Sequence, residues 1–356
     1  MPKRHLQGFA MHQIAPNFLK DFLNATLTGN QPDKPSSGAL PNGASWHWIG
    51  EGALVWQPAN PSLRQRDIVI SSGVHGDETA PIEVCNQLIQ DLAAGNLVAQ
   101  NRILFLFGNL PAMRAAKRYL DDDLNRLFSG KHATMTQSRE APRAAQLENW
   151  VKTFFEEAPP ATNPVERLHL DLHTAIRGSR FARFAVAPYK PGPLLAQSTV
   201  DWLQRAEIDA VLLNAKPAGT FSYFTSNAFQ AKSLTLELGK VRPFGQNDLS
   251  QFAGIHKGLQ ELITGDAAAQ VAHPLHVFQI AGEIERRTVD NFQLHIADDV
   301  ENFTPFAKGT VLAEDENYQY VVQHEEERIV FPNRTVKPGL RAGLMVVETR
   351  LEQHVG

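Results

Sequence analysis

Between residues 66 and 264, short apolar runs alternate with longer segments of helical periodicity. The apolar runs lack a strict polar alternation, which is typical of strands buried on both faces. They read DIVISSGV, RILFLFG, RLHLDLH, RFAVAP, AVLLNA and SLTLELG. The helical patterns between them cover 80–95, 140–157, 193–206 and 247–264. This order predicts an α/β fold in which helices cover both faces of one sheet.

The segment before this region has a different character. A helical pattern at 17–27 is followed by a stretch at 29–44 that is rich in Pro, Gly and Ser, which predicts a loop. The runs SWHWIG and ALVWQP then predict a hairpin around residues 50–52.

After about residue 266 the helical periodicity stops, and apolar residues alternate with polar ones between Gly, Asn and Pro. That pattern indicates half-buried β structure. We therefore expect an α/β catalytic domain at 1–265 and a smaller all-β domain at 266–356, joined by a linker at 264–274.

The composition excludes several classes of protein. A formal net charge of -4 and a pI near 6.4 argue against a general nucleic-acid binder, which needs a basic surface. No apolar run approaches the roughly 18–20 residues that span a bilayer, and the first residues do not resemble a signal peptide. A single cysteine, Cys85, excludes an internal disulfide and suits a reducing compartment. We expect a cytoplasmic protein without nucleic-acid or membrane partners, and the oligomeric state stays open.

Polar residues at the carboxyl ends of the expected strands are candidate site residues, because ligands of open α/β sheets bind there. His75 and Glu78 follow the first run, and Gly73 and Gly76 permit a tight turn that could aim both side chains at one point. Imidazole and carboxylate are common zinc ligands. The alternative is a loop histidine beside a glutamate that favours a helix amino terminus.

The run RLHLDLH places three polar side chains on one face of a strand and leucines on the other. Burial of such a face is costly unless it meets water or a partner. His173, nearest the carboxyl end, is placed to be a third metal ligand, and Asp171 could orient a ligand histidine. His169 lies deeper, where we expect a hydrogen-bonded core histidine. Three protein ligands with one open position are typical of catalytic zinc.

Two further strand ends carry charged residues. Glu237 ends the run SLTLEL and is a candidate general base, although an edge-strand glutamate paired with Lys240 is the alternative. After RILFLFG come Arg118, Asn125 and Arg126 among other charged residues. A guanidinium can bind a carboxylate in a bidentate manner and Asn adds a neutral donor, so we expect Arg118, Asn125 and Arg126 to contact substrate. About half of the charges in this segment are expected to form a solvated face.

Four phrases together resemble one enzyme family. They are GVHGDE, GNLPAMRAAKRYLDDDLNRLF, LDLHTAIRGS and LTLELGK, and they occur in the order of that family. From about residue 45 to its end, the chain is similar to the succinylglutamate desuccinylase/aspartoacylase family. The resemblance implies a zinc carboxypeptidase-like mixed sheet flanked by helices, with one Zn²⁺ per chain. The implied zinc ligands are His75, Glu78 and His173, and the implied general base is Glu237.

The same resemblance implies roles for the cationic residues. Arg118 would polarise the scissile carbonyl, and Asn125 with Arg126 would hold a substrate carboxylate. The family also places an arginine and tyrosines near the substrate, for which Arg177 and Tyr223 are the candidate counterparts here.

The implied reaction is hydrolysis of N2-succinyl-L-glutamate to succinate and L-glutamate, the last step of the arginine succinyltransferase route of arginine catabolism. The alternatives are a deacylase of another N-acyl amino acid such as N-acetylaspartate, a peptide carboxypeptidase, and a non-catalytic protein that binds metal or an acidic metabolite. A binding protein would be expected to lose its base or a metal ligand, whereas this chain retains all of them. The ligand set favours zinc, although cobalt or manganese could occupy such a site in vitro.

Overall fold

A computed structural model describes residues 15–61, 66–157, 165–266, 269 and 273–356. Its strands are β1 (Ser36–Ala39), β2 (Ser45–Gly50), β3 (Ala53–Gln57), β4 (Arg66–Ser72), β5 (Arg102–Phe107), β6 (Glu166–Ala175), β7 (Phe184–Ala187), β8 (Ala210–Leu213), β9 (Lys232–Lys240), β10 (His276–Glu285), β11 (Gln293–Leu294), β12 (Thr304–Ala307), β13 (Val311–Asp315), β14 (Tyr318–Val321), β15 (Glu326–Val330) and β16 (Arg341–Thr349).

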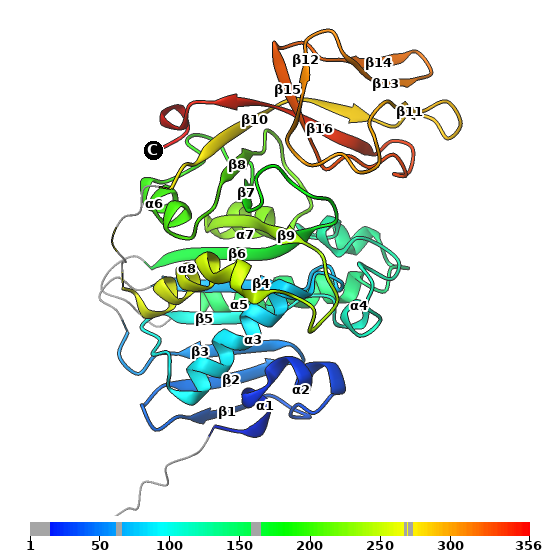
Figure 1. The fold of residues 1–356 in the computed structure, drawn as a ribbon. Coiled ribbons are helices and arrows are strands. Elements are labelled where there is room, and N and C mark those ends of the chain that lie inside the picture. Colours follow the sequence, from blue (N-terminus) through cyan, green and yellow to red (C-terminus); the bar gives the residue numbers. More distant parts are fainter. Residues whose placement is uncertain (1–14, 62–65, 158–164, 267–268, 270–272) are drawn as a thin grey trace, which may run out of the picture.

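The helices complete an α/β architecture with a smaller β-rich end (Figure 1). They are α1 (Asn17–Lys20), α2 (Phe22–Thr28), α3 (Thr79–Ala94), α4 (Leu110–Arg114), α5 (Ala141–Glu156), α6 (Gln197–Arg205), α7 (Phe221–Phe229) and α8 (Ala253–Thr264), with 3₁₀ turns at Leu124–Arg126, Lys131–Thr134, Leu249–Phe252 and Leu351–Gln353. None of the described helices is both long and apolar enough to cross a membrane.

One large mixed sheet organises the described residues, in the order β1-β2-β3-β5-β4-β6-β9-β7-β8-β10-β16-β15-β12. Strands β5, β4, β6 and β9 are parallel, so their carboxyl ends lie at one edge. Strand β7 runs antiparallel to β9. The six apolar runs are confirmed as strands β4 to β9, and the predicted hairpin is confirmed as β2 and β3.

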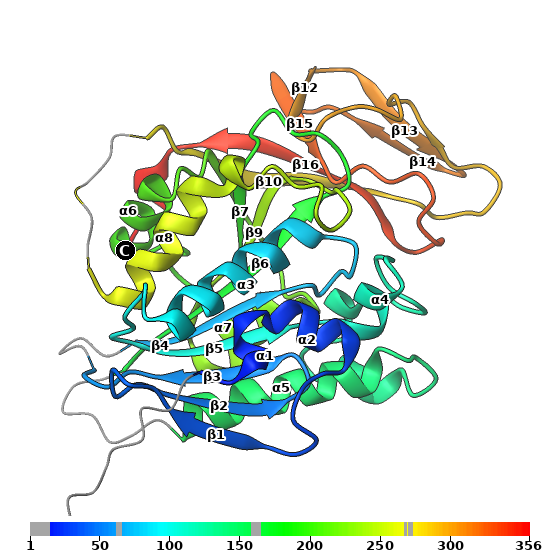
Figure 2. The same ribbon diagram turned by 60° about the horizontal axis from the view of Figure 1, so that its bottom comes forward.

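Helices cover both faces of this sheet, as predicted. Helices α1, α2, α3, α6 and α8 share one hydrophobic core with the sheet, whereas α5 and α7 contribute to a second core on the opposite face (Figure 2). Apolar residues of β4 alternate between the two cores, with Ile68 and Ile70 in the first and Val69 in the second. Burial of both faces explains why the run has no polar alternation.

Strand β1 and helix α7 are among the elements that the sequence does not predict. Strand β1 lies inside the expected loop at 29–44, where it pairs with β2. A Cβ atom on Gly38 would lie 2.7 Å from the Trp46 ring, so the small residues of β1 allow close packing on this indole. Helix α7 is rich in aromatic, Ser and Thr residues of modest helix propensity, and it begins where Thr220 Oγ1 accepts a hydrogen bond from the Tyr223 amide.

The carboxyl-terminal part is all β, apart from a final 3₁₀ turn, as predicted. Strand β10 runs parallel to β8, with Val277 opposite Val211, so the large sheet continues into this part. Strands β11, β13 and β14 form a separate small sheet. The expected linker at 264–274 lies partly outside the described residues, and the boundary at 265/266 stays a prediction.

Candidate active site

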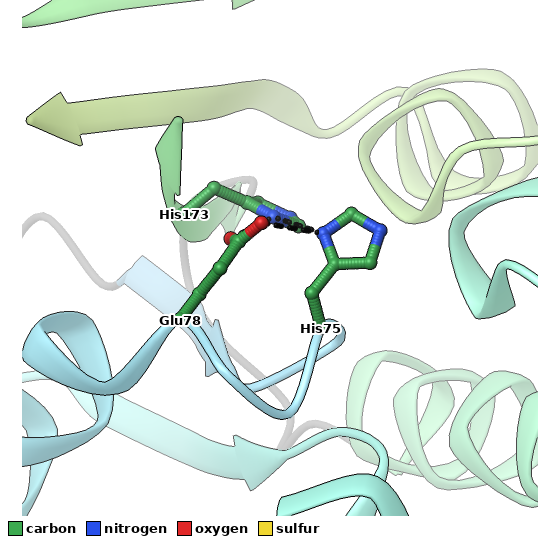
Figure 3. Close-up of side chains that lie close together, drawn as sticks. All are labelled: His75, Glu78 and His173. Atoms are coloured by element: carbon green, nitrogen blue, oxygen red, sulfur yellow. Dashed lines mark hydrogen bonds and ion pairs between the residues drawn. The ribbon is translucent and has the colours of Figure 1, made fainter. Parts of the chain in front are cut away.

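The carboxyl ends of β4 and β6 bring His75, Glu78 and His173 together, and all three are buried (Figure 3). Between β4 and α3 the chain makes a tight turn in which a Cβ atom on Gly76 would lie 2.3 Å from the backbone of Ala112. Only glycine fits this close approach without displacement of the backbone. The turn aims His75 and Glu78 towards His173, which comes from the end of β6.

The donor atoms of the three side chains lie close enough to share one metal ion. His75 Nδ1 lies 2.9 Å from Glu78 Oε1 and 3.2 Å from His173 Nδ1, and His173 Nδ1 lies 2.9 Å from Glu78 Oε2. Glu78 occupies the N-cap position of α3 but makes no capping hydrogen bond with its side chain. Its carboxylate faces the histidines instead. Two imidazoles and a carboxylate are a donor set that fits zinc.

Each histidine makes a hydrogen bond to an aspartate through the ring nitrogen that faces away from Glu78. The Nε2 atom of His75 lies 2.9 Å from Asp123 Oδ1, and the Nε2 atom of His173 lies 2.9 Å from Asp171 Oδ2. A carboxylate only accepts hydrogen bonds, so both imidazoles donate to the aspartates through Nε2–H, and a metal would replace the Nδ1 protons that face Glu78. Asp171 therefore contacts the histidine that, from the sequence, we expect it to orient.

The electrostatics of the cluster favour a cation between these groups. Burial lowers the pKa of His173, but the carboxylates of Asp171 and Glu78 outweigh it and hold that pKa well above its usual value. Burial raises the pKa of Glu78, but His75 and His173 outweigh it and hold that pKa well below its usual value. The site therefore stabilises positive charge at the point where the three side chains meet.

Glu237 lies beside the cluster because of strand register. It occupies the position on β9 that pairs with His173 on β6. Burial and the nearby Glu78 carboxylate raise the pKa of Glu237 to about 7, which suits a general base near neutral pH. Strand β9 lies between β6 and β7, so Glu237 is not on an edge strand.

Arg118 contacts the cluster directly. Its Nη1 atom donates a hydrogen bond of 2.6 Å to Glu78 Oε1. Burial lowers the pKa of Arg118, but nearby carboxylates, Glu78 first and Glu237 among them, raise it above its usual value. The guanidinium is therefore a fixed positive charge within reach of both the candidate metal ligand and the candidate base.

Asn125 and Arg126 lie on the 3₁₀ turn next to the cluster. Asn125 is buried, and its Oδ1 accepts a hydrogen bond of 2.9 Å from the Phe221 amide, which orients its NH₂ group towards His173. The Arg126 side chain is 58% exposed, and its Nη2 lies 3.6 Å from Asp123 Oδ2. A largely exposed guanidinium beside a buried site is placed to receive an anionic ligand from solvent.

Family models match both parts of the chain. Residues 64–263 match the succinylglutamate desuccinylase/aspartoacylase catalytic domain, and residues 273–349 match the AstE/AspA barrel-sandwich hybrid domain. The chain belongs to the succinylglutamate desuccinylase/aspartoacylase family.

The alignments with similar proteins cover nearly the whole chain. A succinylglutamate desuccinylase from Burkholderia orbicola (strain MC0-3) is 50% identical over 336 residues, which cover 94% of this chain and 97% of that protein. The crystal structure of a succinylglutamate desuccinylase from Chromobacterium violaceum is 41% identical with a TM-score of 0.81, covering 93% of this chain and 98% of the other. The Vibrio cholerae counterpart is 34% identical with a TM-score of 0.86, covering 94% and 96%.

In this family member, the side chain of Arg177 bonds to the carboxyl-terminal part of the chain. Its Nη1 atom donates to the carbonyl oxygen of Asp298, so the side chain joins the loop after β6 to the carboxyl-terminal part. The adjacent loop makes a further backbone contact there, where the Asn302 amide donates to Gly178 O. The expected second counterpart, Tyr223, is buried in the first turn of α7.

Three contributors to the site are not evident from the sequence. Asp123 follows two other aspartates, and nothing in the pattern distinguishes the one that contacts His75. Buried Glu140 accepts hydrogen bonds from the backbone amides of Leu120, Asp121 and Asp122, which fixes the loop that carries Asp123. Arg341 begins β16 and pairs with Glu283 at 3.6 Å, and burial together with the nearby Arg126 guanidinium outweighs that partner and lowers its pKa.

Proposed function

We propose that this chain is a zinc-dependent amidohydrolase that converts N2-succinyl-L-glutamate to succinate and L-glutamate. The observation that carries this proposal is the meeting of His75, Glu78 and His173 within one buried cluster, with Glu237 on the paired strand position. The relative at 50% identity, which matches 94% of this chain, is named succinylglutamate desuccinylase and supports the choice of substrate.

The proposed metal ligands are the two Nδ1 atoms of the histidines and the Glu78 carboxylate. One bound Zn²⁺ would supply Lewis-acid chemistry, which lowers the pKa of water and polarises a carbonyl oxygen. His75 and His173 contribute neutral nitrogen donors in this arrangement, because Asp123 and Asp171 accept their Nε2 protons.

Glu237 is the proposed general base. Its pKa is about 7 before a metal binds, so near neutral pH the carboxylate can take a proton from the attacking water and then protonate the departing amine of glutamate. Arg118 is proposed to bind the carbonyl oxygen as negative charge develops there, and one such donor is typically worth roughly 3–4 kcal/mol. In this role Arg118 would turn from Glu78 towards the substrate.

The cations around the cluster suit a substrate that carries three carboxylates. Asn125 and Arg126 are the proposed carboxylate contacts, and Arg341 brings a second guanidinium near Arg126. Arg341 already pairs with Glu283 Oε1 at 3.6 Å, so the 58% exposed Arg126 is the guanidinium better placed to bind an added carboxylate. Arg177 is proposed as a further substrate contact, which requires release of its bond to Asp298. Such remote contacts can position the amide for attack.

We place this reaction in the cytoplasm, as the last step of the arginine succinyltransferase route of arginine catabolism. The main competing activity is hydrolysis of N-acetyl-L-aspartate, because the matching catalytic-domain model also includes aspartoacylases. A shorter acyl group on a smaller amino acid would leave one fewer carboxylate for the cations of this site.

The deciding experiment measures glutamate release from N2-succinyl-L-glutamate beside aspartate release from N-acetyl-L-aspartate. Each assay is run with and without a chelator, and zinc is then restored. The proposal predicts chelator-sensitive turnover of the succinyl substrate that zinc restores, with little turnover of the acetyl substrate. Preference for N-acetyl-L-aspartate would contradict the substrate assignment. Protein that holds zinc yet hydrolyses neither substrate would contradict the proposed reaction.

A further inference from the structure

A buried polar face extends from the candidate metal cluster into the core under helix α7. It is formed by strands β4, β6 and β9, whose register places Ser71 opposite Asp171 and His169 opposite Ser233. Helix α7 adds Thr225 to this face, and all five of these side chains are buried. Apolar side chains could fill the same space, so a continuous polar chain here calls for a reason.

The first link of this chain has a defined direction. Ser71 Oγ lies 2.6 Å from Asp171 Oδ1 and 2.8 Å from His169 Nε2. The serine has one hydroxyl proton, and the carboxylate can only accept, so that proton goes to Asp171. His169 must therefore donate to Ser71 through Nε2–H.

The protonation state of His169 sets the direction of the remaining hydrogen bonds. Burial lowers the pKa of His169 to about 4, so near neutral pH it carries one proton, at Nε2, and its Nδ1 accepts. Thr225 Oγ1 lies 2.8 Å from that Nδ1 and must donate to it, because donation to the Ser222 carbonyl at 3.1 Å would leave a buried acceptor unpaired. Ser233 Oγ, 2.8 Å from Thr225 Oγ1, then donates to the threonine.

We propose that Ser71 and His169, supported by Thr225 and Ser233, are positioning residues that hold Asp171 so that His173 keeps its proton on Nε2 and offers Nδ1 to the metal. Every hydrogen bond of the chain points towards the Asp171 carboxylate, and successive bonds of one direction reinforce one another. The inference rests on the proposed role of His173 as a metal ligand. The proposal adds a layer of hydrogen bonds beyond the aspartate. This layer runs from Ser71 on β4, past β6, to Ser233 on β9.

The direction of the chain can be observed without any assay of activity. In zinc-loaded protein labelled with ¹⁵N-histidine, two-bond ¹H–¹⁵N NMR correlations at pH 7 report which ring nitrogen of His169 carries the proton. The proposal predicts a proton on Nε2 and a bare Nδ1. A proton on Nδ1 would reverse the direction and overturn the proposal.

The effect on the metal is measured as zinc affinity, by competition with a chromophoric chelator. Ser71→Ala should weaken zinc binding by up to about tenfold, the lower end of the range for direct partners of metal-binding histidines, because Ser71 acts through Asp171. Thr225→Val, which keeps the shape of threonine, should weaken it by a smaller factor, and Thr225→Ser should restore the affinity of the unchanged chain. Urea unfolding of each variant shows whether it has folded.

Thr235→Val is the matched control. Its hydroxyl lies 2.8 Å from Ser222 Oγ on the same buried face but outside the chain that ends at Asp171, so its zinc affinity should not change. Equal effects of Ser71→Ala and Thr235→Val, or no effect of Ser71→Ala in folded protein, would overturn the proposal. Because zinc alone is the probe, these outcomes do not depend on which acyl amino acid is hydrolysed.

Discussion

His173 on β6 and Glu237 on β9 are paired residues of neighbouring parallel strands. The pairing places a candidate metal ligand and a candidate base on the same face of the sheet, at the edge where the strands end. A slip of one residue would turn Glu237 to the opposite face, among the leucines of the first core. Strand register, rather than a flexible loop, therefore sets the separation of the metal and the base.

The substitution Glu237→Gln tests whether Glu237 acts as the base without being a metal ligand. The substitution keeps the size of the side chain but removes its ability to accept a proton, so turnover should fall by about 10²–10⁴-fold. Zinc content should not change, because Glu237 is not among the three clustered donors. Steady-state kinetics and metal analysis on the same sample check both statements. A fully active variant would refute the role of Glu237 as base.

The dependence of kcat/KM on pH should reflect the same carboxylate. Glu237 must be deprotonated to act as a base, so activity should be lost as the pH falls through its pKa, which is about 7 without bound metal. Bound zinc places positive charge nearby and stabilises the carboxylate, so the acid limb of the active enzyme should lie below pH 7. A profile in which Glu237→Gln retains that limb would assign it to another group.

Much of this site follows from the sequence because strand ends and side-chain alternation are local properties. The run RLHLDLH gives the faces of His169, Asp171 and His173 directly, and the structure has the leucines on the other face. The rule that ligands bind at the carboxyl ends of parallel strands then brings His75 towards His173, although 98 residues separate them.

The remainder depends on tertiary contacts that leave no local pattern. Asp121, Asp122 and Asp123 are equivalent in the sequence, and only the loop held by Glu140 determines which carboxylate reaches His75. Helix α7 has modest intrinsic propensity and forms because Phe221 packs into the core and Thr220 caps its first turn. Arg341 is far along the chain from every motif, so only the folded sheet brings it near Arg126.

Asp123→Asn should weaken zinc binding. The amide can no longer hold the His75 Nε2 proton as a charged acceptor, and loss of such a partner typically costs 10–100-fold in metal affinity. Asp122→Asn, in the same acidic run, is the matched control and should retain the original affinity. Chelator competition gives both values. Similar losses in the two variants would indicate a general effect of charge rather than orientation of His75.

Arg126→Ala should reduce kcat/KM for N2-succinyl-L-glutamate by about 10–100-fold, because a charge-assisted contact with a carboxylate is worth about 1.5–3 kcal/mol. Its zinc affinity should be unaffected. Arg139→Ala is the control, since Arg139 pairs with exposed Asp121 in a neighbouring segment. If an analogue without the bound carboxylate loses as much activity in Arg126→Ala as the full substrate does, the assigned contact is wrong.

His169 should make the metal-free protein sensitive to mild acid. The pKa of His169 is about 4 in the folded chain and 6.5 for an unperturbed histidine. As the pH falls from 6.5 towards 4, the unfolded chain therefore binds a proton at this residue that the folded chain does not bind. At pH 4.5 this difference should lower the free energy of unfolding by about 2–3 kcal/mol relative to pH 7. Urea unfolding at the two pH values, with chelator present, measures the change.

In His169→Gln the change should be smaller by that amount, because glutamine does not titrate. An identical change in both proteins would show that His169 is already protonated, or free to become so, in the folded state.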